Sequence, residues 1–187
     1  MNKPKRLIIG ITGASGIQYG IRLIELLKPL PIETHLIITK AAHQVRQYES
    51  SLDASALNEL ADVCHHVNDV GCSVASGSYQ TLGMIVAPCS MHTLAEVANG
   101  FGNNALTRAA DVMLKERRKL VLMVRESPLN AAHLENMLKV TQMGGIIAPP
   151  VPAFYNEPKS IEDLINHSAG RVLDLFDIDT DVVKRWK

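Results

Sequence analysis

A glycine-rich turn near the start of the chain has the composition of an anion-binding site. Gly10, Gly13 and Gly16 recur every third residue between a short apolar run and a stretch with helical spacing. Such a turn exposes backbone N–H groups at a helix N-terminus, where phosphate binds favourably. The spacing differs from the G-x-G-x-x-G of dinucleotide-binding folds, and the second strand ends in Thr39-Lys40 instead of an acidic residue. A mononucleotide therefore fits better than a dinucleotide, with a tight turn that needs glycine for geometry alone as the alternative.

A second group of polar residues, Pro88–Thr93, follows a buried apolar run. Ser90 and Thr93 place hydroxyl groups where a helix would begin, beside backbone N–H groups that have no intrahelical partner. This pattern suits a second anion or the edge of a flavin, whereas Ser90 taken alone is typical of an ordinary helix N-cap. Cys89 could act as a nucleophile, but no base stands next to it in the sequence, which favours a buried apolar role.

Charged residues on one predicted helix indicate a polar cleft. Arg108, Asp111 and Lys115 recur at i, i+3 and i+7 on a helix that is apolar around much of its girth. Charges on such a helix often face a cleft, although Asp111 and Lys115 could form an exposed i,i+4 pair. Arg125-Glu126 comes directly after an apolar strand, where arginine can bind phosphate and a carboxylate can move protons. A salt bridge that caps the strand end explains this pair equally well.

Three further polar residues have no obvious role in the sequence alone. Arg171 lies on the same stripe of the last predicted helix as Leu164 and Leu175. A cation on that stripe requires a buried partner or an anionic ligand. Tyr155 ends a proline-rich arm with a hydroxyl donor, for which packing is the alternative. Glu49, near the end of the second predicted helix, is typical of a solvated surface residue.

Short apolar segments alternate with helical periodicity along the chain, and these elements must position the polar residues. We expect strands over residues 7–11, 34–39, 83–88, 120–124 and 146–148. We expect helices from Ile17, over 41–50 and 53–63, after Ser90, and over 107–118, 131–143 and 161–176. Strands that are apolar throughout predict a parallel sheet with helices on both faces, whose ligands bind at the carboxyl ends of the strands. The pattern over 187 residues predicts an α/β fold in a single domain, 1–187.

Composition and charge argue against several classes of function. The formal net charge is zero and aromatic residues make up 4%, which argues against a nucleic-acid-binding protein. Three cysteines without a C-x-x-C pair indicate a reducing compartment, and His65, His66 and His92 lack metal-ligand spacing. The sequence has neither a recognisable signal peptide nor an apolar run of membrane-spanning length. We therefore expect a cytoplasmic protein with no membrane span, no nucleic-acid partner and no metal site.

Taken together, these residues resemble one protein family nearly from end to end. The sequence is similar to the UbiX/Pad-type flavin prenyltransferases in nine ordered blocks and in the closing Arg185-Trp186. The blocks are Thr12–Gly16, Thr39–Ala42, Glu49, Ser76–Ser78, Pro88–Ser90, Arg108–Val112 with Leu114–Glu116, Arg125-Glu126, His133–Met137 and Pro152–Tyr155.

The resemblance implies a fold, an assembly and a reaction. It implies a flavodoxin-like Rossmann fold, a homo-dodecamer, and binding of FMN. The family joins a dimethylallyl group from dimethylallyl monophosphate to N5 and C6 of reduced FMN, without a metal ion. The product, prenylated FMN, is the cofactor of UbiD-type decarboxylases, which act in ubiquinone biosynthesis or on aromatic acids.

The resemblance also implies roles for residues at matching positions. FMN would be held by Gly13, Ala14, Ser15, Thr39, Ser90, Met91, His92, Thr93 and Arg125. The prenyl chain would lie near Ser76 and Gly77. The prenyl phosphate would be held by Arg108, Lys115, Glu126, Tyr155 and Arg171. The implied catalytic residues are the proton-handling pair Ser15 and Glu49, with Lys115 and Glu126 at the phosphate.

Two positions depart from the family pattern, and three other classes of protein compete with it. His92 stands where relatives often carry Lys, and Thr39 where many carry Ser, so fine cofactor contacts would differ. FMN-dependent cysteine decarboxylases carry a P-x-M-N-x-x-M-W segment, whereas the single Trp here is Trp186. A non-catalytic flavin carrier would not need cations such as Lys115 and Arg171. NAD-dependent redox chemistry is further weakened by the glycine spacing.

Overall fold

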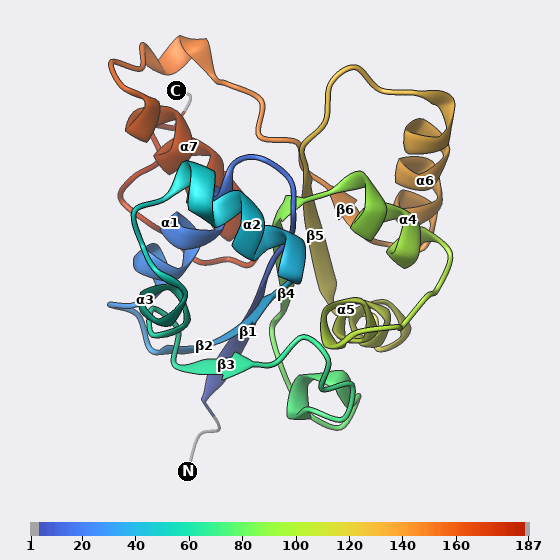
Figure 1. Cartoon of the computed structure of the whole chain (residues 1–187). Helices are drawn as coiled ribbons and strands as arrows, with labels where there is room; N and C mark the ends of the chain where they lie inside the picture. Colours follow the sequence, from blue (N-terminus) through green and yellow to red (C-terminus); the bar gives the residue numbers. More distant parts are fainter. Residues whose placement is uncertain (1–3, 186–187) are drawn as a thin grey trace.

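A parallel β-sheet with helices on both faces organises residues 4–185, which the computed structural model describes (Figure 1). Its strands are β1 (Lys5–Ile11), β2 (Ile32–Ile38), β3 (Val63–His65), β4 (Gly83–Cys89), β5 (Lys119–Val124) and β6 (Ile146–Ile147). The strand order is β3-β2-β1-β4-β5-β6, and every pairing is parallel. Without the short edge strand β3, this is the 2-1-3-4-5 order of flavodoxin-like sheets. The predicted fold class is confirmed, while Trp186 lies outside the described residues.

The helices divide between the two faces of the sheet. They are α1 (Ile17–Leu27), α2 (Lys40–Glu49), α3 (Ala54–Asn58), α4 (Met91–Ala98), α5 (Ala105–Lys115), α6 (Ala131–Gln142) and α7 (Ile161–Asp174), with 3-10 turns η1 (Ser73–Ala75) and η2 (Phe154–Asn156). Leu7 and Ile9 of β1 pack in one buried cluster with α1 and α7, whereas Ile8 packs in the other with α4 and α5. Within residues 4–185, none of these helices combines the length and apolar character needed to cross a membrane.

Several predicted elements differ from the structure in their bounds; for example, the helix expected over 107–118 spans Ala105–Lys115. The helix expected over 53–63 ends at Asn58, and Val63–His65 forms the strand β3. The Asp62 carboxylate accepts hydrogen bonds from the Thr34 backbone N–H (2.7 Å) and hydroxyl (2.8 Å), which docks this segment onto β2. Pro88 does not end its strand either, because β4 continues to Cys89 after a register shift.

A buried threonine joins the two turns nearest the centre of the sheet. The Thr12 hydroxyl, 1% exposed, donates to the Pro88 carbonyl at 2.7 Å and accepts from the Ser90 N–H at 2.8 Å. Thr12 follows β1 and Ser90 follows β4, so one side chain fixes the β1–α1 turn against the β4–α4 turn. These strands are neighbours where the strand order reverses, which is where open α/β sheets bind ligands.

Replacing Thr12 with valine tests this constraint. Thr12→Val keeps the shape but leaves the Ser90 N–H without its partner and the Pro88 carbonyl with only the longer bond from the Thr12 N–H (3.3 Å), which costs about 1–3 kcal/mol of unfolding free energy. Urea unfolding at one protein concentration measures this loss, and Thr12→Ser, which keeps the hydroxyl, is the matched control. Equal stability of Thr12→Val and wild type would contradict the assignment.

Candidate functional site

Three strand-to-helix turns meet at the carboxyl edge of the sheet and carry most of the predicted cofactor residues. The β1–α1 turn holds Gly13–Ser15, the β2–α2 turn holds Thr39, and the β4–α4 turn holds Ser90, with Met91–Thr93 in the first turn of α4. The first two turns touch, because a Cβ added to Gly13 would overlap the methyl group of Ala41. Glycine at position 13 is therefore required by this close approach.

The hydroxyl residues of the second and third turns cap helices. The Thr39 hydroxyl accepts from the Ala42 N–H at 3.2 Å, and the Ser90 hydroxyl accepts from the Thr93 N–H at 3.2 Å. The N-cap interpretation of Ser90 is thus confirmed, while contact with a cofactor stays a prediction for all these residues. The His92 side chain is 83% exposed, with Nδ1 3.6 Å from the Glu96 carboxylate.

The first turn is capped by a carboxylate from another helix. Glu49, the last residue of α2, accepts hydrogen bonds from the backbone N–H groups of Gly16 (2.8 Å) and Ile17 (3.3 Å) and from the Ser15 hydroxyl. Gly16 adopts φ 102° and offers no side-chain cap of its own. The interpretation of Glu49 as a solvated surface residue was therefore wrong, because the N–H groups expected to hold phosphate are occupied by this carboxylate.

Electrostatics keep Glu49 ionised. Burial raises the pKa of its carboxyl group, but the hydrogen bonds from Ser15, Gly16 and Ile17, with the charge of Arg125, outweigh burial and lower the pKa overall. Glu49 is accordingly an anion at neutral pH, hydrogen-bonded to the Ser15 hydroxyl. This arrangement supports the predicted Ser15–Glu49 proton-handling pair, since the carboxylate can accept a proton through the hydroxyl.

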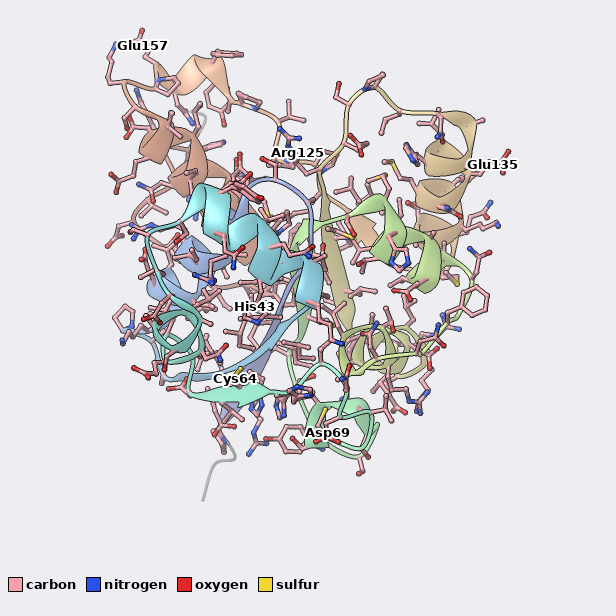
Figure 2. All side chains as sticks on the ribbon, in the orientation of Figure 1. His43, Cys64, Asp69, Arg125, Glu135 and Glu157 are labelled. Carbon is pink, nitrogen blue, oxygen red and sulfur yellow. The ribbon has the colours of Figure 1, made fainter. Side chains whose placement is uncertain are left out.

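A hollow of about 380 Å³ opens beside this pair. Its walls are formed by Ser15, Gly16, Gln18, Tyr19, Glu49, Arg125, Ile161 and Ile165. Figure 2 shows Arg125 where β5 ends, between the α7 and α6 sides of the molecule. Burial raises the pKa of the Tyr19 hydroxyl, while the charge of Arg125 lowers it to a smaller extent. Tyr19 was missed in the sequence, where a tyrosine three residues after Gly16 gives no signal that its ring packs against the turn.

The donors at this edge of the sheet fit the predicted FMN. Hydroxyl groups, helix N-termini and one guanidinium are the groups that bind a mononucleotide phosphate and a flavin ring. Cys89 does not add a nucleophile, because full burial strongly raises the pKa of its thiol. Among residues 4–185, no three His, Cys, Asp or Glu side chains are grouped so that they could hold a metal ion.

Lys115 and Arg108 belong to a second group of predicted site residues, on α5. Lys115 pairs with Glu116, and Arg108 pairs with Asp111 at 2.6 Å, so within residues 4–185 the alternative of an Asp111–Lys115 pair is not formed. The loop with Ser76 and Gly77 packs here, because a Cβ on Gly77 would lie 2.8 Å from the Lys115 ammonium. These residues therefore form a cluster of their own.

A third group lies on the face of the sheet that α7 covers. Arg171 is 53% exposed and pairs with Asp174, 14% exposed, at 2.5 Å, which supplies the partner that the sequence required. Arg171 borders a separate hollow of about 230 Å³ beside the proline-rich arm. The Tyr155 ring packs edge-on against His167, with centroids 5.8 Å apart.

One copy of the chain does not bring the three groups together. Lys115 precedes β5 and Arg125 follows it, so they lie at opposite ends of a strand that spans roughly 17 Å. The helix α7, which carries Arg171, packs on the other face of the sheet from α5 (Figure 1). Glu126 is exposed and its carboxylate accepts from the Ser127 N–H at 2.9 Å, and no Arg125–Glu126 salt bridge forms among the described residues.

Known proteins match this sequence over nearly its whole length. Residues 1–173 match the family model described as Flavoprotein. The flavin prenyltransferase UbiX of Neisseria meningitidis serogroup B is 54% identical over 183 residues, covering 98% of this chain and 97% of the relative.

Two solved structures share the fold and much of the sequence. The structure of AnUbiX (PadA1) in complex with FMN and dimethylallyl pyrophosphate is 50% identical, with a TM-score of 0.97, and the match covers 99% of this chain and 98% of that one. A dodecameric FMN-dependent Ubix-like decarboxylase from Escherichia coli O157:H7 is 45% identical, with a TM-score of 0.95 and coverage of 97% and 99%.

The cap formed by Glu49 predicts a pH-dependent contribution to stability. Because its folded-state pKa is lowered, the stabilisation is present above the ordinary pKa of about 4.3 and is lost as pH falls through the folded value. Glu49→Gln should therefore cost about 1 kcal/mol at pH 6 and progressively less towards pH 3. Urea unfolding across this range measures the difference, with the exposed Glu135→Gln on α6 as control. A cost that does not change with pH would refute an ionised cap.

Proposed function

Because this chain belongs to the UbiX/Pad-type flavin prenyltransferase family, we propose that it joins the dimethylallyl group of dimethylallyl monophosphate to N5 and C6 of reduced FMN. The chain is an FMN-binding enzyme, and the finer chemistry is the proposal. The observation that carries it is the ionised Glu49 on the Ser15 hydroxyl, in a hollow that Arg125 also lines. A pure flavin carrier has no use for an ionised proton acceptor on the Ser15 hydroxyl.

The three turns at the carboxyl edge supply the flavin contacts in this proposal. The residues that would hold FMN are Gly13, Ala14, Ser15, Thr39, Ser90, Met91, His92, Thr93 and Arg125. Bound reduced FMN supplies the nucleophilic ring positions that become joined to the allylic carbon. The Glu49 carboxylate would accept a proton released near this turn through the Ser15 hydroxyl, because this carboxylate is ionised before the reaction.

Cations and one hydroxyl would stabilise the departing phosphate. Arg108, Lys115, Arg171 and Tyr155 supply charge and hydrogen-bond donors, and Glu126 would exchange a proton with the phosphate. Positive charge of this kind stabilises the oxygen that gains negative charge as the C–O bond breaks. In the proposal these residues replace a divalent metal, and Ser76 and Gly77 border the prenyl chain.

The separation of these residues within one copy implies an assembly. Lys115 and Arg171 lie on opposite faces of the sheet, so a shared phosphate site requires more than one chain. The Ubix-like decarboxylase from E. coli is dodecameric, and we propose the same assembly for this chain. The prenylated FMN would then serve a UbiD-type decarboxylase, in ubiquinone biosynthesis or in aromatic acid decarboxylation.

Mass analysis of the flavin tests the reaction directly. The protein is incubated without oxygen with reduced FMN and either dimethylallyl monophosphate or the pyrophosphate, with no added metal and with a chelator in a parallel sample. Gain of one C5 prenyl unit on the extracted flavin is expected, and omission of protein is the control. Bound but unmodified FMN from folded protein would instead identify a carrier or a decarboxylase-like flavoprotein.

Mixed oligomers test the shared phosphate site. Lys115→Ala and Arg171→Ala should each lower turnover by about 100-fold or more while FMN stays bound. Each variant removes a positive charge that would contact the phosphate and none that would hold FMN. Oligomers that contain both variants should recover about one quarter of wild-type turnover, since random assembly restores that share of intact sites. No recovery would place both residues on one copy in the site. Mixed wild-type oligomers with two tags serve as the control.

A further inference from the structure

The loop that carries Ser76 and Gly77 is held against α5 by contact with an ion pair. It runs between η1 and β4, and η1 packs beside α5 (Figure 1). A Cβ on Gly77 would overlap the Glu116 carboxylate, which itself pairs with the Lys115 ammonium. The position of Lys115 therefore depends on where the backbone of this loop lies.

Arg118 binds this loop at two backbone carbonyls. Its guanidinium donates to the Gly77 carbonyl at 2.6 Å and to the Tyr79 carbonyl at 2.7 Å. Two donors of one planar guanidinium fix the direction of both carbonyls, which a flexible lysine cannot do. The Arg118 backbone is itself fixed, because its N–H donates to the Met113 carbonyl of α5 at 2.8 Å.

Tyr79 provides a second anchor on the opposite side of the loop. Its ring lies under the Arg6 guanidinium, 4.5 Å from the ring centroid, and its hydroxyl lies 3.4 Å from the Glu33 carboxylate. Glu33 is held in turn by Arg6 and by His35, each at 2.8 Å. The loop is thus attached to α5 by its carbonyls and to the start of the sheet by the Tyr79 side chain.

We propose that Arg118 is a positioning residue for the prenyl transfer, which holds the Ser76–Ser78 loop so that Lys115 points into the phosphate site. This inference rests on the proposed function, in which Lys115 binds the allylic phosphate and Ser76 and Gly77 border its chain. Arg118 acts through the loop backbone and does not itself contact the substrate. Its loss therefore affects use of the allylic phosphate and leaves the distant flavin turns intact.

Arg118→Gln tests the role, with Arg117→Gln as the matched control. Arg117 is exposed and next in sequence, so the control removes the same charge without touching the loop carbonyls. We expect Arg118→Gln to lower kcat/KM for dimethylallyl monophosphate about 10–100-fold, because small displacements of positioning groups have effects of this size. The Kd of FMN should change by less than about twofold, since Arg118 contacts the loop carbonyls and α5 and none of the residues that would hold FMN.

A second measurement does not depend on turnover. Amide exchange at Ser76 and Tyr79 should become at least about fivefold faster in Arg118→Gln and stay unchanged in Arg117→Gln. Arg118→Lys keeps the charge and one carbonyl contact, so it should lose less activity than Arg118→Gln. It replaces the glutamine variant in both measurements if that variant does not fold.

The outcomes separate the two hypotheses. Wild-type protein that makes no prenylated flavin would overturn the proposed function, whatever Arg118 does. With an active wild type, unchanged loop exchange or unchanged kcat/KM in Arg118→Gln would overturn the positioning role alone. A loss of FMN affinity equal to the loss of kcat/KM would overturn it too, because that result means general disruption.

Discussion

The hydroxyl of Thr12 is the contact on which the arrangement of the site depends. It satisfies the Pro88 carbonyl and the Ser90 N–H at once, where water cannot replace it. The helices that follow these two turns, α1 and α4, cover opposite faces of the sheet. In open α/β sheets, ligands bind in the crevice between such helices, and Thr12 fixes the two turns that border it.

The negative charge of Glu49 then limits which groups can bind at the β1–α1 turn. The carboxylate occupies the N-terminus of α1, which is the position that a glycine-rich turn most often offers to phosphate. A phosphate group placed there would meet a negative charge, so it must find its donors at the α2 and α4 turns or at Arg125. The glycine-rich turn instead places an ionised carboxylate and a serine hydroxyl beside the hollow.

How much the sequence could predict follows from the range of each signal. Apolar strands and caps such as Ser90 are local patterns, so the parallel sheet and the helix starts were predicted well. The short strand β3 was missed because it depends on Asp62 reaching Thr34 of β2, a contact distant in sequence. Glu49 alone looked like a surface residue for the same reason. The hydrophobic periodicity of the sequence does not show that the last residue of α2 lies at the N-terminus of α1.

The charges on α5 and α7 give an electrostatic reason for keeping these residues apart within one copy. Lys115, Arg108 and Arg171 each pair with a carboxylate of their own chain, and the formal net charge of the chain is zero. Several cations gathered on one copy with no anion bound would repel one another in a poorly solvated site. Because these cations are kept apart, each is neutralised by a carboxylate of its own chain. Each is also exposed enough to leave that carboxylate for another anion. In the proposed assembly, a phosphate group that contacts several copies would supply the negative charge that makes their approach favourable.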